Sequence, residues 1–332
     1  MSTEQAAGAI EVDTAAENND DGYAESSASS TLTSIKSEIR KGMEENGRIY
    51  AVYGENEYAM PVDEREQDRL DMQHHKYTLL TDDKLHLAPL PAKPQRILDI
   101  GTGTGIWAID MADKYTAAEV VATDIAPVQP TWVPPNCSFI LEDCNSPQWQ
   151  FADASFDLIH CRDGFMTVRD WAAFARTAFA HLRPGGWTEL ACMMPVPECD
   201  DGSMPPDCAY VEACSVFRRI GEAMGVDFLD PKRYKHFLED AGYVNVEQRL
   251  FKMPSSEWPK DKRLKTIGAL ERLNVVEGGE AFLVRGVTKQ LGMTREQMEV
   301  LLAKMRKELN SNRIHAWVPF YVVYGQKPHG NS

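Results

Sequence analysis

The fold of this chain is decided by the stretch Leu98-Asp99-Ile100-Gly101-Thr102-Gly103-Thr104-Gly105. Apolar residues in 95–100 predict a buried strand that leads into it, and residues 105–115 predict a helix that follows it. Three alternate glycines allow the turn to close tightly and bring its backbone near a ligand, where a Cβ would obstruct the approach. A glycine-rich turn between a strand and a helix therefore predicts a ligand-binding loop.

Strand and helix patterns continue to alternate after this loop. Residues 119–124, 137–141, 156–161 and 187–190 predict four more strands. A helix is predicted before the last of these strands, because six apolar residues share one helical face: Trp171, Phe174, Ala175, Ala178, Phe179 and Leu182. Residues 183–186 (Arg-Pro-Gly-Gly) end this helix. This alternation predicts an α/β fold, with a parallel sheet and helices on both of its faces.

The remaining chain predicts further elements on both sides of this core. Residues 63–80, 207–224 and 231–240 predict helices, and residues 244–250 predict a strand. Thr294 and Gln297 form a capping-box pattern that starts another helix, and residues 317–325 predict a last strand. Two strands beyond five parallel ones favour a seven-stranded, mostly parallel sheet over the six-stranded sheet of a dehydrogenase.

The spacing of the glycines separates two classes of ligand. A dinucleotide fingerprint, G-x-G-x-x-G, requires a third glycine at position 106, which is Ile106. The observed G-x-G-x-G, preceded by Asp99, resembles motif I of the class I methyltransferases, which have a Rossmann-like fold and use S-adenosylmethionine (SAM). A short-chain oxidoreductase is the alternative, but the chain between His160 and Trp187 contains neither Tyr nor Lys for its Tyr-x-x-x-Lys pair.

The resemblance implies a set of residues around SAM. Asp124 ends the second predicted strand, where a carboxylate can accept hydrogen bonds from both hydroxyls of a ribose. Asp143 follows the third strand and is placed to accept from the amine of adenine, with a solvated turn carboxylate as the alternative. Together with the loop these positions form the predicted cofactor-binding set: Asp99, Gly101, Thr102, Gly103, Gly105, Asp124, Ile125, Asp143 and Cys144.

Two histidines are the candidate catalytic bases. SAM carries a reactive methyl group, so a base is needed only where the acceptor must lose a proton. His160 ends the fourth predicted strand at the sheet edge where ligands bind, with a buried structural histidine as the alternative, and His74 lies on the helix 63–80, which we expect to cover the loop. Acceptor contacts are expected from residues 192–316, where apolar surface is supplied by Met193, Met194, Met204, Phe217 and Trp258.

Segments in the same order along residues 46–328 resemble the fungal LaeA-like methyltransferases. They are 46–50 (NGRIY), 68–75 (DRLDMQHH), 96–107 (RILDIGTGTGIW), 129–136 (QPTWVPPN), 156–162 (FDLIHCR), 258–261 (WPKD), 314–317 (IHAW) and 321–325 (YVVYG). The resemblance implies a role in fungal secondary metabolism. Methylation of O, N or S on a small natural product is the preferred interpretation, and regulation of secondary metabolism and development through velvet-type or other protein partners is the alternative.

Composition excludes other classes of function. Residues 1–42 predict a disordered acidic tail before a folded domain at 43–332, and the net charge of −15 argues against direct binding to nucleic acid. No apolar run reaches the roughly 20 residues of a membrane span, and no secretion signal precedes the domain, so the cytoplasm or the nucleus is expected. Seven cysteines without a C-x-x-C pair predict reduced thiols, and no metal site is expected although Cys199, Cys208 and Cys214 are neighbours in sequence.

Overall fold

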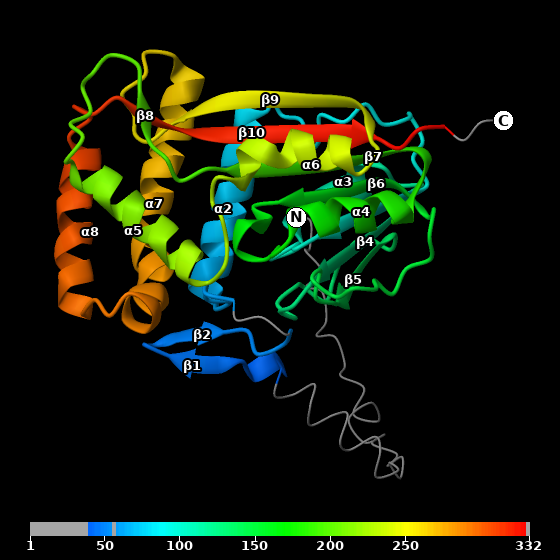
Figure 1. Cartoon of the computed structure of the whole chain (residues 1–332), viewed down its shortest axis with the longest axis horizontal. Coiled ribbons are helices and arrows are strands. Elements are labelled where there is room, and N and C mark those ends of the chain that lie inside the picture. The colour runs from blue at the N-terminus through cyan, green and yellow to red at the C-terminus, as the bar shows by residue number, and fades with distance from the viewer. Residues whose placement is uncertain (1–38, 55–57, 330–332) are drawn as a thin grey trace, which may run out of the picture. The chain divides into compact units, whose positions relative to one another are not determined.

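The computed structural model describes residues 39–54 and 58–329, which belong to one compact unit (Figure 1). Most of the predicted acidic tail, residues 1–38, lies outside the described residues. The last part of that predicted tail is described, and residues 39–41 are helical. A short hairpin follows, formed by β1 (Met43–Glu45) and β2 (Arg48–Tyr50).

The centre of the fold is an eight-stranded sheet. Its order is β5 (Cys137–Leu141), β4 (Glu119–Asp124), β3 (Arg96–Ile100), β6 (Phe156–Arg162), β7 (Leu182–Met193), β10 (Ala316–Gln326) and β8 (Glu198–Cys199), with β9 (Val244–Pro254) also paired to β10. The strands from β5 to β7 are parallel, whereas β10 runs antiparallel to each of its neighbours. The predicted mostly parallel sheet is confirmed, and its eighth strand is the two-residue β8, which is too short to leave a periodic pattern in the sequence.

Helices cover both faces of the parallel strands. α4 (Trp171–His181) and α6 (Tyr234–Asp240) pack on one face, where Trp171 and Leu238 share a core with Leu98 and Ile159. α3 (Ile106–Lys114) packs on the other face, and its Trp107 belongs to a second core. Alternate strand residues point to opposite faces, so each buried strand contributes to both cores.

Four more helices form a group beside β7 and β10: α2 (Glu64–Leu80), α5 (Ala209–Ala223), α7 (Lys262–Gln290) and α8 (Arg295–Asn310) (Figure 1). The capping box predicted at Thr294 and Gln297 is present at the start of α8. α7 is the longest of these helices, at 29 residues. None of the helices in the described part of the chain is long and apolar enough to span a membrane.

The segment 183–186 was predicted to separate α4 from a strand that starts at Trp187. In the structure β7 already starts at Leu182, which pairs with Phe156, and the register shifts before Trp187 pairs with Leu158. The Arg-Pro-Gly-Gly segment is therefore a bulge inside the strand. Gly185 takes up the positive φ of 83° that this bulge requires.

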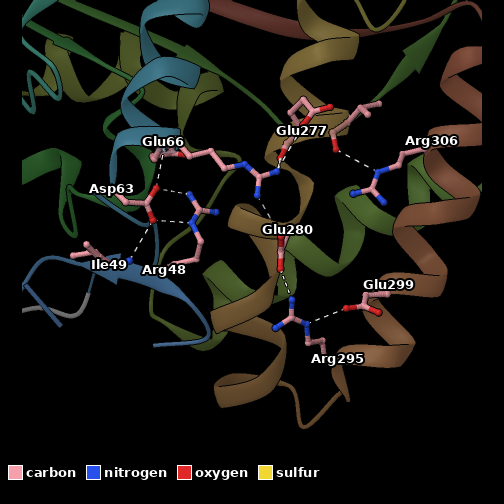
Figure 2. A network of polar contacts seen from close by, with 11 residues as sticks. Arg48, Ile49, Asp63, Glu66, Glu277, Glu280, Arg295, Glu299 and Arg306 are labelled. Carbon is pink, nitrogen blue, oxygen red and sulfur yellow. Dashed lines mark hydrogen bonds and ion pairs between the residues drawn. The ribbon is translucent and has the colours of Figure 1, made fainter. Parts of the chain in front are cut away.

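Polar contacts hold the hairpin and the helical group together, as Figure 2 shows. Arg48 of β2 donates two hydrogen bonds, of 2.7 and 2.8 Å, to Asp63, the residue that caps the first turn of α2. Arg295 of α8 forms an ion pair of 2.6 Å with Glu280 of α7. α2, which was predicted to lie over the glycine loop, is thus fixed at its N-terminal end.

Candidate functional site

The glycine loop follows β3 and holds three glycines with positive φ. A Cβ added to Gly101 (φ 69°) would meet no heavy atom within 4 Å, and one added to Gly103 (φ 59°) would meet only Leu70, at 3.4 Å. Both glycines line the large cavity described below. A Cβ on Gly105 would instead lie 2.5 Å from the ring of Phe139, so this glycine serves the packing of α3 against the sheet.

Asp99 lies beneath the loop and is almost fully buried. One carboxylate oxygen accepts a hydrogen bond of 2.6 Å from the Thr102 hydroxyl, and the other accepts one of 2.7 Å from Nδ1 of His160. The imidazole of His160 stacks on Trp107 with ring centroids 3.7 Å apart. Asp99 therefore ties the glycine loop to the end of β6, and Thr102 and His160 border a smaller hollow next to the loop.

Asp124, at the end of β4, lines the cavity on the other side of the loop. Its carboxylate accepts backbone hydrogen bonds from Gly103 (2.8 Å) and Ala126 (2.9 Å). Burial nevertheless raises the pKa of Asp124 to about 6. A carboxylate that is costly to ionise is well suited to accept hydrogen bonds from a ligand.

The next part of the cavity wall differs from the sequence prediction. Ile125, Glu142 and Cys144 line the cavity, and burial raises the pKa of the Cys144 thiol. Asp143, between the last two, accepts hydrogen bonds from the backbone and the amide of Asn145, at 2.9 and 2.8 Å. Glu142 is the acidic residue of this turn that lines the cavity, and the predicted contact of Asp143 with adenine stays a prediction.

His74, the second candidate base, lies on α2 and is buried. Its Nδ1 accepts a hydrogen bond of 2.9 Å from Arg162, and its Nε2 donates one of 2.9 Å to Asp110. Burial lowers the pKa of His74, which agrees with a neutral ring that accepts at one nitrogen and donates at the other. Both ring nitrogens are engaged, so the ring has no lone pair available for a substrate proton in this arrangement.

One continuous cavity, partly open to solvent, joins the glycine loop to the helical group. The part away from the loop is mostly apolar and lies between α5, α7, α8 and the ends of β7 and β10; we call it the apolar chamber. It is lined by Met193, Phe217, Val275, Phe282, Leu283, Leu302, Met305 and Val318. Of the five predicted acceptor contacts, Met193 and Phe217 line the cavity, whereas Met194, Met204 and Trp258 lie outside it.

Polar side chains border the cavity between the loop and the apolar chamber, and we call them the polar wall. Asp163, the residue after β6, accepts from Gln73 (2.7 Å) and Tyr77 (2.7 Å) of α2, and Gln73 also accepts from Arg69 (2.8 Å). Sequence reasoning missed this wall, because its members lie up to ninety residues apart in the chain. Their only local signal is the polar segment 69–77 within a helix expected to lie over the loop.

The wall continues into α7 as a buried ion pair. Glu271 pairs with Lys76 of α2, and both side chains are fully buried. The same Glu271 oxygen accepts from Asn274 at 3.2 Å, and Asn274 accepts from Arg69 at 2.6 Å. Among the described residues, no group of three or more His, Cys, Asp or Glu side chains is arranged to hold a metal ion.

Comparison with known proteins agrees with this geometry. Residues 72–248, which include the glycine loop and Asp163, match the family model described as a methyltransferase domain. The chain is 41% identical to methyltransferase pytC of Aspergillus terreus, over 90% of this chain and 92% of that protein. It is 34% identical to the secondary metabolism regulator LAE1 of Cochliobolus heterostrophus (86% and 94% covered) and 33% identical to the protein-methionine methyltransferase laeA of Emericella nidulans (90% and 80% covered). The glycine loop at the end of β3 opens into a cavity, and the relatives match along nearly the whole chain. This protein therefore belongs to the LaeA-like family of methyltransferases.

Proposed function

We propose that the chain transfers a methyl group from SAM to a small, largely apolar natural-product intermediate bound in the apolar chamber. The observation that carries this proposal is the continuity of the cavity, which runs without a break from the glycine loop to the chamber. A scaffold that acts only through its surface has no need of an apolar chamber that joins the glycine loop. The chamber has the apolar lining typical of small-molecule sites.

The residues at the loop end fit SAM. The open space above Gly101 leaves room for a ligand against the backbone, and Asp124 offers carboxylate oxygens to the ribose hydroxyls. Ile125, Glu142 and Cys144 would border the adenine, and Thr102 the amino-acid end. Gly105 and Asp143 support this site from outside the cavity, Gly105 through α3 and Asp143 through the turn at Asn145.

Methyl transfer from SAM depends mainly on the positioning of the acceptor against the methyl group. SAM supplies a methyl group on a sulfonium, which reacts with a nucleophile that is held in line with it. Asp99 holds the loop through Thr102 and holds His160 against Trp107. Asp99 and His160 therefore act as positioning residues. The engagement of both nitrogens of His74 favours a similar role for that ring, which orients Arg162 at the cavity wall.

A pair of α7 variants tests the acceptor assignment. Val275 lines the chamber, whereas Leu273, two residues earlier, is 42% exposed outside it. In a strain that lacks the chain, complementation with Leu273→Trp should restore the wild-type metabolite profile. Val275→Trp should leave one accumulating precursor that lacks a single CH2 unit, because the indole fills the chamber. Restoration of the full profile by Val275→Trp would contradict the proposal.

Regulation is the second candidate, because two of the relatives carry regulatory or protein-directed names: secondary metabolism regulator and protein-methionine methyltransferase. A regulator that works through protein partners predicts a broad loss of metabolites on deletion. A variant unable to bind SAM would then restore those metabolites. That pair of outcomes would replace the tailoring function by the regulatory one.

A further inference from the structure

Asp163 lies where the cofactor end and the acceptor end of the cavity meet. It borders both the large cavity and the smaller hollow beside Asp99 and Thr102. Its backbone is left-handed, with φ 54°, a conformation that few residues other than glycine adopt and that Asp and Asn tolerate best. Such strained positions cluster at functional sites.

The hydrogen-bond donors around this carboxylate are neutral. Gln73 and Tyr77 donate to Oδ2 at 2.7 Å each, and the backbone N–H of Met193 donates to Oδ1 at 3.2 Å. They hold the carboxylate in one orientation and leave its charge without a cationic hydrogen-bond partner among the described residues.

The cations of the surrounding elements are directed to other groups. Arg69 pairs with Glu66, and Lys76 pairs with Glu271. Arg162, the neighbour of Asp163, donates to His74 and lies over the ring of Tyr77. Asp99 and Asp124 add negative charge on the loop side of the cavity. Arg69 and Arg162 line the same cavity, but neither donates a hydrogen bond to Asp163, so this carboxylate keeps a charge with which a cationic ligand can pair.

The strand order fixes which part of SAM would reach this position. β4 with Asp124 and β6 with Asp163 lie on opposite sides of β3, the strand that leads into the glycine loop. With a ribose at Asp124 and the adenine at Ile125 and Cys144, on the side of β5, the sulfur of SAM would lie towards β6. The apolar chamber begins beyond β6, on the side of β7 and β10.

From this arrangement we infer that Asp163 is the anionic contact of the sulfonium and makes the site prefer the charged donor SAM over its neutral product, S-adenosylhomocysteine (SAH). The inference rests on the proposed function, since it needs SAM at the glycine loop. Methyl transfer removes the positive charge from sulfur, so the attraction to Asp163 ends with the reaction. The same carboxylate thus retains the donor and weakens the hold on the product.

Binding measurements test this without knowledge of the acceptor. Calorimetry on the full chain compares SAM, SAH and sinefungin, in which a carbon with an amine that is charged at neutral pH replaces the sulfonium sulfur and its methyl group. The wild-type chain should bind SAM and sinefungin more tightly than SAH. Asp163→Asn keeps the shape and the left-handed backbone but removes the charge. A nearby opposite charge changes the protonation equilibrium of a side chain by one to three powers of ten. Loss of the Asp163 charge should therefore lower the ratio of the SAH Kd to the SAM Kd about tenfold or more.

Tyr77→Phe is the matched control, because it removes one hydrogen bond to Asp163 and keeps the carboxylate. It should leave the ratio within about twofold of the wild-type value, since one neutral hydrogen bond of roughly 1 kcal/mol affects both ligands alike. Equal weakening of all three ligands by Asp163→Asn would overturn the inference. A wild-type chain that binds SAH as tightly as SAM would also overturn it, even if Asp163→Asn fails to fold. Absence of binding by SAM, sinefungin and SAH to the wild-type chain would instead refute the proposed cofactor.

Discussion

Asp124 carries a charge that burial opposes in the ligand-free protein. Its pKa rises from the ordinary 3.8 to about 6, although two backbone N–H groups donate to it. A folded-state pKa above the unfolded value stabilises the fold fully below pH 3.8, and this contribution, about 3 kcal/mol, is lost as the pH rises through 6. Ribose hydroxyls that donate to the carboxylate would offset that loss.

We therefore expect ligand affinity to depend on pH. Hydroxyl donors favour the ionised carboxylate, so the Kd of SAH should be constant above pH 7 and should rise up to about tenfold between pH 7 and pH 5. Calorimetry across this range measures the effect. Asp124→Asn should bind SAH more weakly and lose the pH dependence. A wild-type Kd that does not change between pH 5 and pH 7 would rule out ionised Asp124 as the ribose acceptor.

Gly101 and Gly47 form a matched pair for testing the cofactor loop. Both have positive φ, 69° and 74°, and a Cβ on either would meet nothing within 4 Å, but Gly47 lies in the β1–β2 hairpin. Replacement of either by Arg should destabilise the fold by a similar 1–2 kcal/mol, roughly the cost of a left-handed side chain. Only Gly101→Arg should abolish SAH binding. Binding retained by Gly101→Arg would place the cofactor elsewhere.

At the scale of elements, the helical group decides what the cavity holds, and α7 is the element that sequence patterns predict least well. Its inward face mixes apolar residues with the buried polar side chains Glu271, Asn274 and Arg285 and with Gly278 and Gly279, so no continuous apolar stripe marks it. α4 was predicted within a residue or two, because its buried face is almost entirely apolar. Buried polar groups therefore interrupt the apolar periodicity from which a helix is predicted.

α8 closes the chamber with Leu302 and Met305, and its capping box predicts a stability effect. Thr294→Ala removes the side-chain acceptor of the Gln297 N–H and should lower the free energy of unfolding by about 1 kcal/mol. Urea unfolding measures this value. Thr266→Ala, at an exposed position within α7, should have almost no effect. Equal effects of the two substitutions would show that the cap contributes nothing.

At the scale of the molecule, the fold around the glycine loop could be predicted from sequence, whereas the polar wall and α7 could not. The strands from β3 to β6 and the glycine loop follow from local patterns, since each is a short apolar run with a turn at its end. The polar wall depends on pairs such as Gln73 with Asp163, which only the completed fold brings together. Those pairs lie where α2 meets the end of β6.

The position of β10 has a consequence for the way the chain folds. This strand is the last element of the sheet along the sequence, yet it lies between β7 and β9 and pairs with both. Until residue 316 has been made, β7 and β9 each present an edge without its final partner. Unpaired edges of apolar strands are sites of aggregation, and pairings between distant parts of a chain form slowly. Production of the folded protein should therefore be limited by how well the growing chain is protected by chaperones until β10 closes the sheet.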